Sequence, residues 1–382
     1  MFVSSRKRMD IGADAAPEFS EILSKALAGE ELSVAGGERL LRAEGEELCA
    51  LVRAADEVRR KIVGEIVTYV INRNINHTNI CAGSCKFCAF QRSPDDSDAY
   101  VLTHEQIAAK VREAIEFGAT EVCIQSGLRP EFGLKDYIGI LQAVRDVSPS
   151  IHIHAFSPSE LDNISMREGL PVEEVIKTLR NAGLNSVPGT AAEILIGRVR
   201  EIICPKKIPT SRWFEIIKTC HRLGVPTTAT MMYGHVETLR ERAQHLSLIR
   251  EVQRETQGFT EFVLLPFMFH NTQLWRERLV SSSPSVPENL RVHAVSRLML
   301  AGFIENIQTS WVKLGPRGAQ LMLTAGANDL GGTLFEENIS RAAGVNQQPM
   351  TPEQLEQLIL ELERVPRQRT TTYGCLIKNM GR

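Results

Sequence analysis

The chain has 382 residues, of which 43% are hydrophobic and 24% are charged, and its formal net charge is -2. This composition is typical of a globular protein and excludes wholesale disorder, collagen-like chains and coiled coils. Because no strongly basic surface is indicated, we expect no nucleic-acid partner. No signal peptide and no run of about 18 to 20 apolar residues is present, so we expect a cytoplasmic protein without membrane association.

Residues 14–63 carry apolar side chains at helical spacing, for example at Phe19, Ile22, Leu23 and Ala26. A Ser- and Gly-containing stretch near residues 33–37 interrupts this pattern. We therefore expect two or three helices that form an N-terminal helical extension over residues 1–63.

From residue 66 onward, short β-branched runs alternate with longer amphipathic stretches. We expect strands at Val67–Asn74, Glu121–Ser126, Ile151–Phe156, Ser186–Pro188, Thr227–Met232, Glu261–Pro266, Asn306–Trp311 and Ala327–Leu330. We expect helices at Thr103–Phe117, Leu134–Val147, Val172–Asn181, Ala191–Arg200, Ser211–Leu223, Leu239–Thr256 and Pro287–Ala301.

This alternation repeats about eight times and predicts an α/β fold, a (β/α)8 TIM-type barrel over residues 64–335. An open doubly wound sheet is the alternative, which the absence of a G-x-G-x-x-G motif after the first strand disfavours. A short helix at Pro352–Arg364 and a polar tail follow. We expect this C-terminal region, residues 336–382, to close on the barrel, with Arg367 and Arg369 either covering the substrate or lying on the surface.

Three of the eight cysteines, Cys81, Cys85 and Cys88, form a C-x3-C-x2-C cluster directly after the first predicted barrel strand. Their close spacing lets three thiolates hold one metal centre. Structural zinc sites take four ligands, usually from C-x2-C pairs, and no second pair exists in this chain. An iron–sulfur cube also takes four thiolates as a rule, so three leave one iron open for a substrate.

The spacing resembles that of the radical S-adenosylmethionine superfamily, which also places an aromatic residue before the last cysteine, here Phe87. The resemblance implies a [4Fe-4S] cluster on the three cysteines whose open iron chelates S-adenosylmethionine. An electron from an external one-electron donor then cleaves the sulfonium to methionine and a 5′-deoxyadenosyl radical. In a barrel, this loop lies at the C-terminal mouth of the strands.

Polar residues follow other predicted strands at the same mouth. Gln125, Ser126 and Gly127 end the second strand, where the superfamily keeps a small, Gly-rich segment beside the methionyl amine, although an ordinary strand-ending turn also explains them. His152 and His154 alternate along the third strand and therefore share one face, which makes His154 a candidate substrate contact unless it is a core residue.

Residues after the fourth, fifth and eighth strands complete the candidate set. Glu193 either caps a helix that begins at Thr190 or points into the pocket. Tyr233 and His235 end the fifth strand, and Asp329 lies in a Gly-rich end of the eighth. We expect His154, Glu193, Tyr233, His235 and Asp329 to contact the substrates.

Longer segments of the sequence resemble one family within this superfamily. Residues 72–79, 154–158, 188–193, 230–235 and 368–374 are together similar to the tyrosine-using subunits of 8-hydroxy-5-deazaflavin (FO) synthases. This implies that the radical takes hydrogen from the amino group of L-tyrosine, whose Cα–Cβ bond breaks to give 2-iminoacetate. The 4-hydroxybenzyl group then adds to C5 of 5-amino-6-(D-ribitylamino)uracil, and a separate radical subunit closes the deazaflavin ring.

Two alternatives remain open. The futalosine-pathway radical enzymes of menaquinone synthesis share many of these segments and act on other substrates. A non-catalytic iron–sulfur protein for electron transfer or sensing is the alternative of another class, and a fourth nearby thiolate would favour it. Cys123 is expected to be an interior strand residue that cannot reach the cluster, whereas Cys375 in the tail is harder to exclude.

Overall fold

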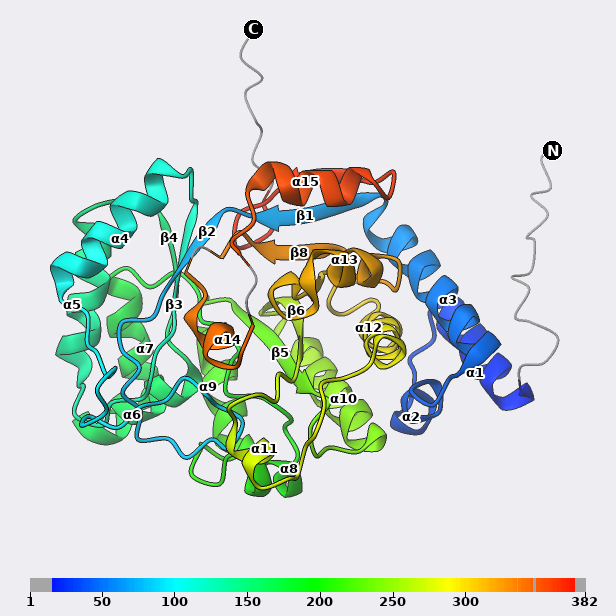
Figure 1. The fold of residues 1–382 in the computed structure, drawn as a ribbon, viewed down its shortest axis with the longest axis horizontal. Helices are drawn as coiled ribbons and strands as arrows, with labels where there is room; N and C mark the ends of the chain where they lie inside the picture. Colours follow the sequence, from blue (N-terminus) through cyan, green and yellow to red (C-terminus); the bar gives the residue numbers. More distant parts are fainter. Residues whose placement is uncertain (1–15, 335, 346–347, 375–382) are drawn as a thin grey trace, which may run out of the picture.

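A computed structural model of the protein describes residues 16–334, 336–345 and 348–374 (Figure 1). Nine strands are described: β1 (Ile66–Val70), β2 (Asn72–Ile75), β3 (Glu121–Ile124), β4 (His152–Ala155), β5 (Thr227–Tyr233), β6 (Phe259–Pro266), β7 (Ile307–Thr309), β8 (Asp329–Gly332) and β9 (Val365–Gln368). Every pair of neighbouring strands is parallel. The predicted α/β class is confirmed.

The first predicted strand is broken at Ile71, and its two halves pair with different partners. β1 lies between β8 and β9, whereas β2 pairs with β3. Two sheets result, one in the order β5-β6-β7-β8-β1-β9 and one in the order β2-β3-β4. The strand expected at Ser186–Pro188 is reduced to two isolated bridges, His154 with Ser186 and Val187 with Thr227. The arrangement is TIM-barrel-like, with regular pairing lost on either side of residues 186–187.

Helices surround these strands (Figure 1). Those of the barrel part are α4 (His104–Glu116), α5 (Leu134–Arg145), α6 (Pro158–Glu168), α7 (Val172–Asn181), α8 (Gly197–Ile203), α9 (Thr210–Arg222), α10 (Leu239–Thr256), α11 (Gln273–Arg276), α12 (Val286–Leu300), α13 (Trp311–Leu323) and α14 (Asn338–Ala342). Within these described ranges, no helix is long and apolar enough to cross a membrane.

Several boundaries differ from those expected, and the helices α6 and α13 were not predicted. The helix predicted from Ala191 begins only at Gly197, because Ala191 and Glu193 have positive φ angles of 67° and 46° that a helix cannot contain. The strand predicted to run to Trp311 ends at Thr309, and Trp311 opens α13 instead. Its indole N–H donates to the carbonyl of Gly332.

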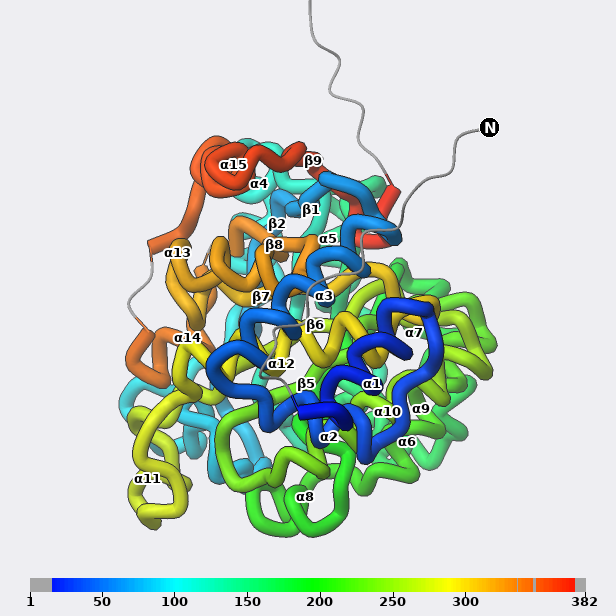
Figure 2. The backbone as a smooth tube through the Cα atoms, turned by 90° about the vertical axis from the view of Figure 1, so that its right-hand side faces the viewer, coloured from blue at the N-terminus to red at the C-terminus, as the bar shows by residue number. Residues whose placement is uncertain are grey.

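The N-terminal extension comprises α1 (Pro17–Leu27), α2 (Val34–Leu40) and α3 (Gly45–Val63). α3 packs on α12 and α2 packs on α10, so the extension lies against the outer helices at one edge of the molecule (Figures 1 and 2). The α2 contact is close, because a Cβ on Gly37 would lie 2.4 Å from the sulfur of Met299. The extension therefore covers the side of the barrel rather than its bottom.

The C-terminal region closes the opposite end from the cysteine loop. After α15 (Pro352–Leu360), β9 pairs in parallel with the first half of the barrel strand. The tail then turns inward, where Arg369 and Thr371 are buried among side chains from the first residues of other strands. The tail thus forms the floor of the barrel.

Candidate active site

The loop that carries the three cysteines, residues 79–90, is held by backbone hydrogen bonds to three distant parts of the chain. Lys86 N–H donates to the carbonyl of Ile203 at 2.8 Å, and the carbonyl of Lys86 accepts from Leu274 N–H at 3.0 Å. Ala82 N–H donates to the carbonyl of Leu128, which follows β3, at 2.9 Å. The loop is therefore fixed on the C-terminal mouth of the barrel, as the sequence predicts.

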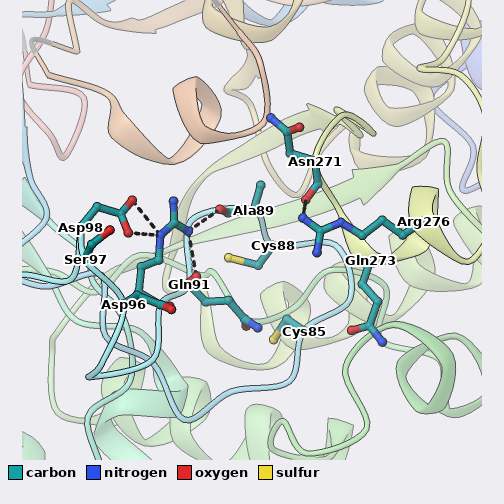
Figure 3. Close-up of a pocket in the computed structure, with 11 residues that line it drawn as sticks. Cys85, Cys88, Ala89, Gln91, Asp96, Ser97, Asp98, Asn271, Gln273 and Arg276 are labelled. Atoms are coloured by element: carbon teal, nitrogen blue, oxygen red, sulfur yellow. Dashed lines mark hydrogen bonds and ion pairs between the residues drawn. The ribbon is translucent and has the colours of Figure 1, made fainter.

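The sulfur atoms of this loop lie in different surroundings. The thiol of Cys81 accepts backbone N–H groups from Gly83 at 3.3 Å and Leu128 at 3.2 Å. Cys85 and Cys88 face a polar pocket of about 660 Å³ (Figure 3). Burial raises the pKa of the Cys85 thiol to about 12 and also raises that of Cys88.

The fit of an iron–sulfur cluster follows from the donor set. Three soft thiol donors lie on one loop, and two backbone N–H groups donate to the sulfur of Cys81. Among the described residues, no three His, Cys, Asp or Glu side chains converge closely enough to hold one metal ion. The chemistry of the loop thus fits a cluster, although the side chains are not gathered around one point.

The segment Gln125-Ser126-Gly127 supports the cysteine loop from below. The hydroxyl of Ser126 accepts from His77 N–H at 2.7 Å, just before the loop. A Cβ on Gly127 would lie 2.2 Å from the carbonyl oxygen of Ile80, so only glycine fits where the two backbones meet. Gln125 lines the barrel cavity, whereas Ser126 and Gly127 do not.

A cavity of about 310 Å³ lies inside the barrel between the cysteine loop and the tail. Phe87, Cys88 and Ala89 bound it at the mouth, and Arg369 and Thr371 bound it at the floor. Glu337, the N-cap of α14, and Ser340 within α14 also line the cavity. The cavity therefore connects the predicted cluster site with the barrel interior.

Glu193 lines this cavity and forms a buried ion pair with Lys207. Burial alone would raise the pKa of Glu193, but the attraction of Lys207 outweighs it and the pKa is lowered. The ammonium of Lys207 also lies 5.2 Å from the centre of the Phe87 ring. Because no helix begins at Thr190, the capping interpretation of Glu193 is wrong and its placement in the pocket holds.

His154 also lines the cavity, and its Nδ1 lies 2.7 Å from the hydroxyl of Ser186. His152 Nε2 lies 2.7 Å from the same hydroxyl, so the two histidines share one face as predicted. Burial lowers the pKa of His154 to about 4 against the opposing charge of Glu121. His154 is therefore neutral near pH 7.

Tyr233 and His235 lie outside the cavity, contrary to the sequence-based expectation. Along β5, Thr228, Thr230 and Met232 face inward, so the period of two turns Tyr233 outward. Its hydroxyl donates to Asn289 Oδ1 at 2.6 Å. His235 is buried against Glu237, with 2.9 Å between Nδ1 and the carboxylate.

Asp329 is likewise placed differently from the expectation. It begins β8 rather than ending it, so it lies at the floor and not at the mouth. Its carboxylate accepts from Arg369 Nε at 2.5 Å and from Thr68 Oγ1. The Gly-rich stretch that was expected at the end of the strand forms the strand β8 itself. Its glycines Gly331 and Gly332 lie close to the side chains of Gln308 and Asn72.

Several cavity residues were not singled out from the sequence. Asn72, Asn74 and Asn76 line the cavity. Their spacing of two residues places them on one face of the first barrel strand, and this spacing could have identified them from the sequence. Glu121 and Glu261 lie near the floor and Lys313 in the first turn of α13. No local sequence pattern marks these three residues. The direction of each side chain follows only once the element that carries it has been placed in the fold.

The search for a fourth thiolate gives a mixed outcome. Cys123 is buried and lines the cavity, and its sulfur accepts from Gln125 Nε2 at 3.3 Å. Cys375 lies outside the described residues. Cys204 is also buried, and the carbonyl of its neighbour Ile203 accepts a hydrogen bond from the cysteine loop.

Comparison with known proteins agrees with this geometry. Residues 75–249 match the model of the radical SAM superfamily, and residues 256–380 match that of the CofH/MqnC C-terminal region. A 5-amino-6-(D-ribitylamino)uracil–L-tyrosine 4-hydroxyphenyl transferase of Archaeoglobus fulgidus is 52% identical over 85% of this chain and 93% of its own. The chain belongs to this transferase family. The transferase of Methanocaldococcus jannaschii is 48% identical over 87% of this chain and 94% of its own.

Two solved structures share the fold of this chain. The hydrogenase maturase HydG of Carboxydothermus hydrogenoformans superposes with a TM-score of 0.71 over 93% of this chain and 80% of its own, at 14% identity. Methylornithine synthase (PylB) superposes with a TM-score of 0.70 over 90% of this chain and 97% of its own, at 18% identity. The radical SAM domain implies a [4Fe-4S] cluster and S-adenosylmethionine as cofactors.

Proposed function

We propose that this chain transfers the 4-hydroxybenzyl group of L-tyrosine to C5 of 5-amino-6-(D-ribitylamino)uracil and releases 2-iminoacetate, in the biosynthesis of a deazaflavin. Membership of the transferase family over most of the chain carries this proposal. The cavity supports it, because the cavity adjoins the cysteine loop and is lined by amide, hydroxyl and carboxylate groups suited to a phenol, an amino acid and a polyol.

We propose that Cys81, Cys85 and Cys88 would hold the cluster, with Phe87 and Gln125-Ser126-Gly127 beside the S-adenosylmethionine. When bound, these cofactors supply a 5′-deoxyadenosyl radical that removes a hydrogen atom from the substrate. Glu193 and Lys207 lie next to Phe87, so this buried pair fixes the wall of the cavity beside the cysteine loop. The absence of a side chain at Gly127 lets the cysteine loop approach the end of β3 closely, at Ile80.

The remaining residues bind and orient the substrates. His154 is neutral and hydrogen-bonded to Ser186, so it offers its second ring nitrogen to a polar substrate group. The side chain of Asn74 lines the cavity between Asn72, which donates to Glu121, and Asn76, which donates to the Gln125 carbonyl. Because a buried polar group left unpaired costs about 1–3 kcal/mol, such a wall discriminates among ligands.

Two partners follow from the proposed reaction. The hydroxybenzyl adduct is not yet a closed ring, so a separate ring-closing radical subunit of the FO synthase takes it further. Cleavage of S-adenosylmethionine to a radical would consume one electron, so an external one-electron donor would be required. Both partners are proposals that rest on the chemistry of the transfer.

The test is product analysis with an anaerobically reconstituted protein. Reduced enzyme, S-adenosylmethionine, L-tyrosine and the ribitylaminouracil are combined, and the products are read by mass spectrometry. We expect 5′-deoxyadenosine together with the hydroxybenzyl adduct, and we expect both to be lost on Cys85→Ala. The variant Cys220→Ala is the matched control, since Cys220 is a buried cysteine of α9 outside the cavity.

Two outcomes would contradict the proposal. Formation of deoxyadenosine without the adduct would indicate a radical enzyme that acts on another class of substrate, such as a futalosine-pathway enzyme. The family model that matches the C-terminal region is named for both CofH and MqnC. If protein with a fully loaded cluster forms no deoxyadenosine, the proposal that the chain is a radical enzyme is wrong.

A further inference from the structure

The charged side chains that line the cavity are, with one exception, paired with other groups of the protein. Glu193 pairs with Lys207, and Arg369 pairs with both Asp329 and Glu261. Glu121 accepts from Asn72 at 2.8 Å and from Thr371 at 2.6 Å. Glu337 accepts from Ser340 N–H at 2.8 Å, where it caps α14. These groups have little capacity left to neutralise a charged ligand.

Lys313 is the exception. Its side chain lines the cavity, and within the part of the chain that the structure describes its ammonium forms no hydrogen bond and no ion pair. Burial lowers its pKa, and the negative charge of Glu337 opposes this shift. The remaining cation of the lining, Arg369, is fully engaged at the floor.

The position of Lys313 is fixed by the local backbone. It lies in the short first turn of α13, directly after β7, and this turn ends at Gly315, whose φ is 71° and whose ψ is 164°. Gln308 and Ser310 precede it and also line the cavity. The backbone of Lys313 is therefore placed beside the cavity by a short turn that directly follows β7.

An unpaired, buried ammonium is unfavourable unless a ligand supplies the opposite charge. Of the two substrates in the proposed reaction, the ribitylaminouracil carries no carboxylate, phosphate or sulfate. L-Tyrosine carries one carboxylate at neutral pH. The amino acid is thus the substrate whose charge matches the free cation of the cavity.

We propose that Lys313 binds the α-carboxylate of the amino-acid substrate and so orients its amino group and side chain in the cavity. This inference rests on the proposed function, because the amino acid is a substrate only there. It adds a specificity: the cavity requires a free carboxylate and discriminates against amino-acid amides. Ser310 and Gln308 line the same cavity and carry polar groups that can hydrogen-bond the substrate.

The test compares two ligands on three forms of the reconstituted full-length protein. Binding of L-tyrosine and of L-tyrosinamide, which lacks the negative charge, is measured by isothermal titration calorimetry under anaerobic conditions. Charge-assisted hydrogen bonds contribute about 1.5–3 kcal/mol, so Lys313→Met should weaken L-tyrosine binding about 10- to 100-fold. Binding of L-tyrosinamide should stay within about twofold. The exposed Lys135 on α5 gives the control variant Lys135→Met, which should change neither value.

A conservative variant separates recognition from structure. Lys313→Arg keeps the positive charge, so it should retain a preference for L-tyrosine over L-tyrosinamide that Lys313→Met lacks. Equal weakening of both ligands in Lys313→Met would overturn the inference, and so would unchanged L-tyrosine binding. Loss of S-adenosylmethionine affinity with L-tyrosine binding intact would assign Lys313 to another carboxylate and also overturn it. Failure of the wild-type protein to bind L-tyrosine at all would instead contradict the proposed function.

Discussion

Arg369, from the C-terminal tail, forms a buried ion pair with Asp329 at the start of β8, with 2.5 Å between Nε and the carboxylate. Its second partner is Glu261 of β6 at 3.0 Å, which also accepts from the hydroxyl of Tyr373. The tail therefore closes the barrel by neutralising carboxylates that the strands bury. The floor of the cavity and the stability of the fold depend on the same contacts.

We expect Arg369→Met to destabilise the fold strongly. Removing one partner leaves Asp329 and Glu261 as uncompensated buried charges, which costs about 3–5 kcal/mol. Urea unfolding monitored by circular dichroism measures this loss. Arg112→Met is the matched control, because the Arg112–Glu105 pair is exposed and should contribute about 0–1 kcal/mol. Equal losses in the two variants would contradict the role assigned to the tail.

The same cluster predicts a pH dependence. Burial raises the pKa of Glu261 to about 7 despite the attraction of Arg369. The folded state then holds more protons than the unfolded state between the ordinary pKa of 4.5 and about 7. This carboxyl therefore contributes stability that is fully present below pH 4.5 and is lost as the pH rises through about 7.

The comparison of wild type with Glu261→Gln isolates that contribution. Between pH 4.5 and 7 the unfolding free energy of the wild type should fall relative to that of the variant, with a difference in slope of at most about 1.4 kcal/mol per pH unit. Urea titrations at several pH values give the two slopes. Parallel curves would show that Glu261 titrates at an ordinary carboxyl pKa.

The contact of Gly127 with the cysteine loop predicts a specific loss on Gly127→Ala. The added methyl group would overlap the carbonyl oxygen of Ile80, so the loop must move. We expect the reconstituted variant to bind less iron per chain than wild type while keeping its far-ultraviolet circular dichroism. The control is Gly197→Ala, where no atom lies within 4 Å of the added Cβ and the backbone is helical. Full iron loading of Gly127→Ala would contradict the close contact.

The outward orientation of Tyr233 gives a further test. Tyr233→Phe leaves the buried Asn289 Oδ1 without its donor and should cost about 1–3 kcal/mol of stability. Because the ring lies outside the cavity, we expect the KM for L-tyrosine to stay within about twofold. Met232→Ala, one residue earlier and inside the cavity, should change that KM. A raised KM in Tyr233→Phe alone would place this side chain in the substrate site.

The sequence predicted the parts of the site that local patterns determine. The spacing of Cys81, Cys85 and Cys88 and their place after the first barrel strand predicted the cysteine loop, and the repeated alternation of strands and helices predicted the α/β fold. His154 lines the cavity and was a candidate because it alternates with His152 along a predicted strand. Glu193 lines it too and was a candidate because it follows the predicted fourth strand.

Other positions depend on register, which a pattern of residue types does not determine. A strand end read one residue too early or too late reverses which side chains face inward, as happened for Tyr233. Asp329 was assigned to the mouth because its strand is short and Gly-rich, and only pairing with β1 shows that it begins the strand. The place of Arg369 at the floor depends on β9, whose sequence Val-Pro-Arg-Gln contains a proline and gave no strand signal.

One measurement tests the central claim most directly. The reconstituted enzyme is given L-tyrosine deuterated on its phenol ring, together with S-adenosylmethionine and 5-amino-6-(D-ribitylamino)uracil, and the uracil-containing product is weighed by mass spectrometry. The account predicts a uracil adduct that carries every ring deuterium, formed together with 5′-deoxyadenosine and unlabelled 2-iminoacetate or its hydrolysis product. Deoxyadenosine formation with an unmodified uracil would contradict it.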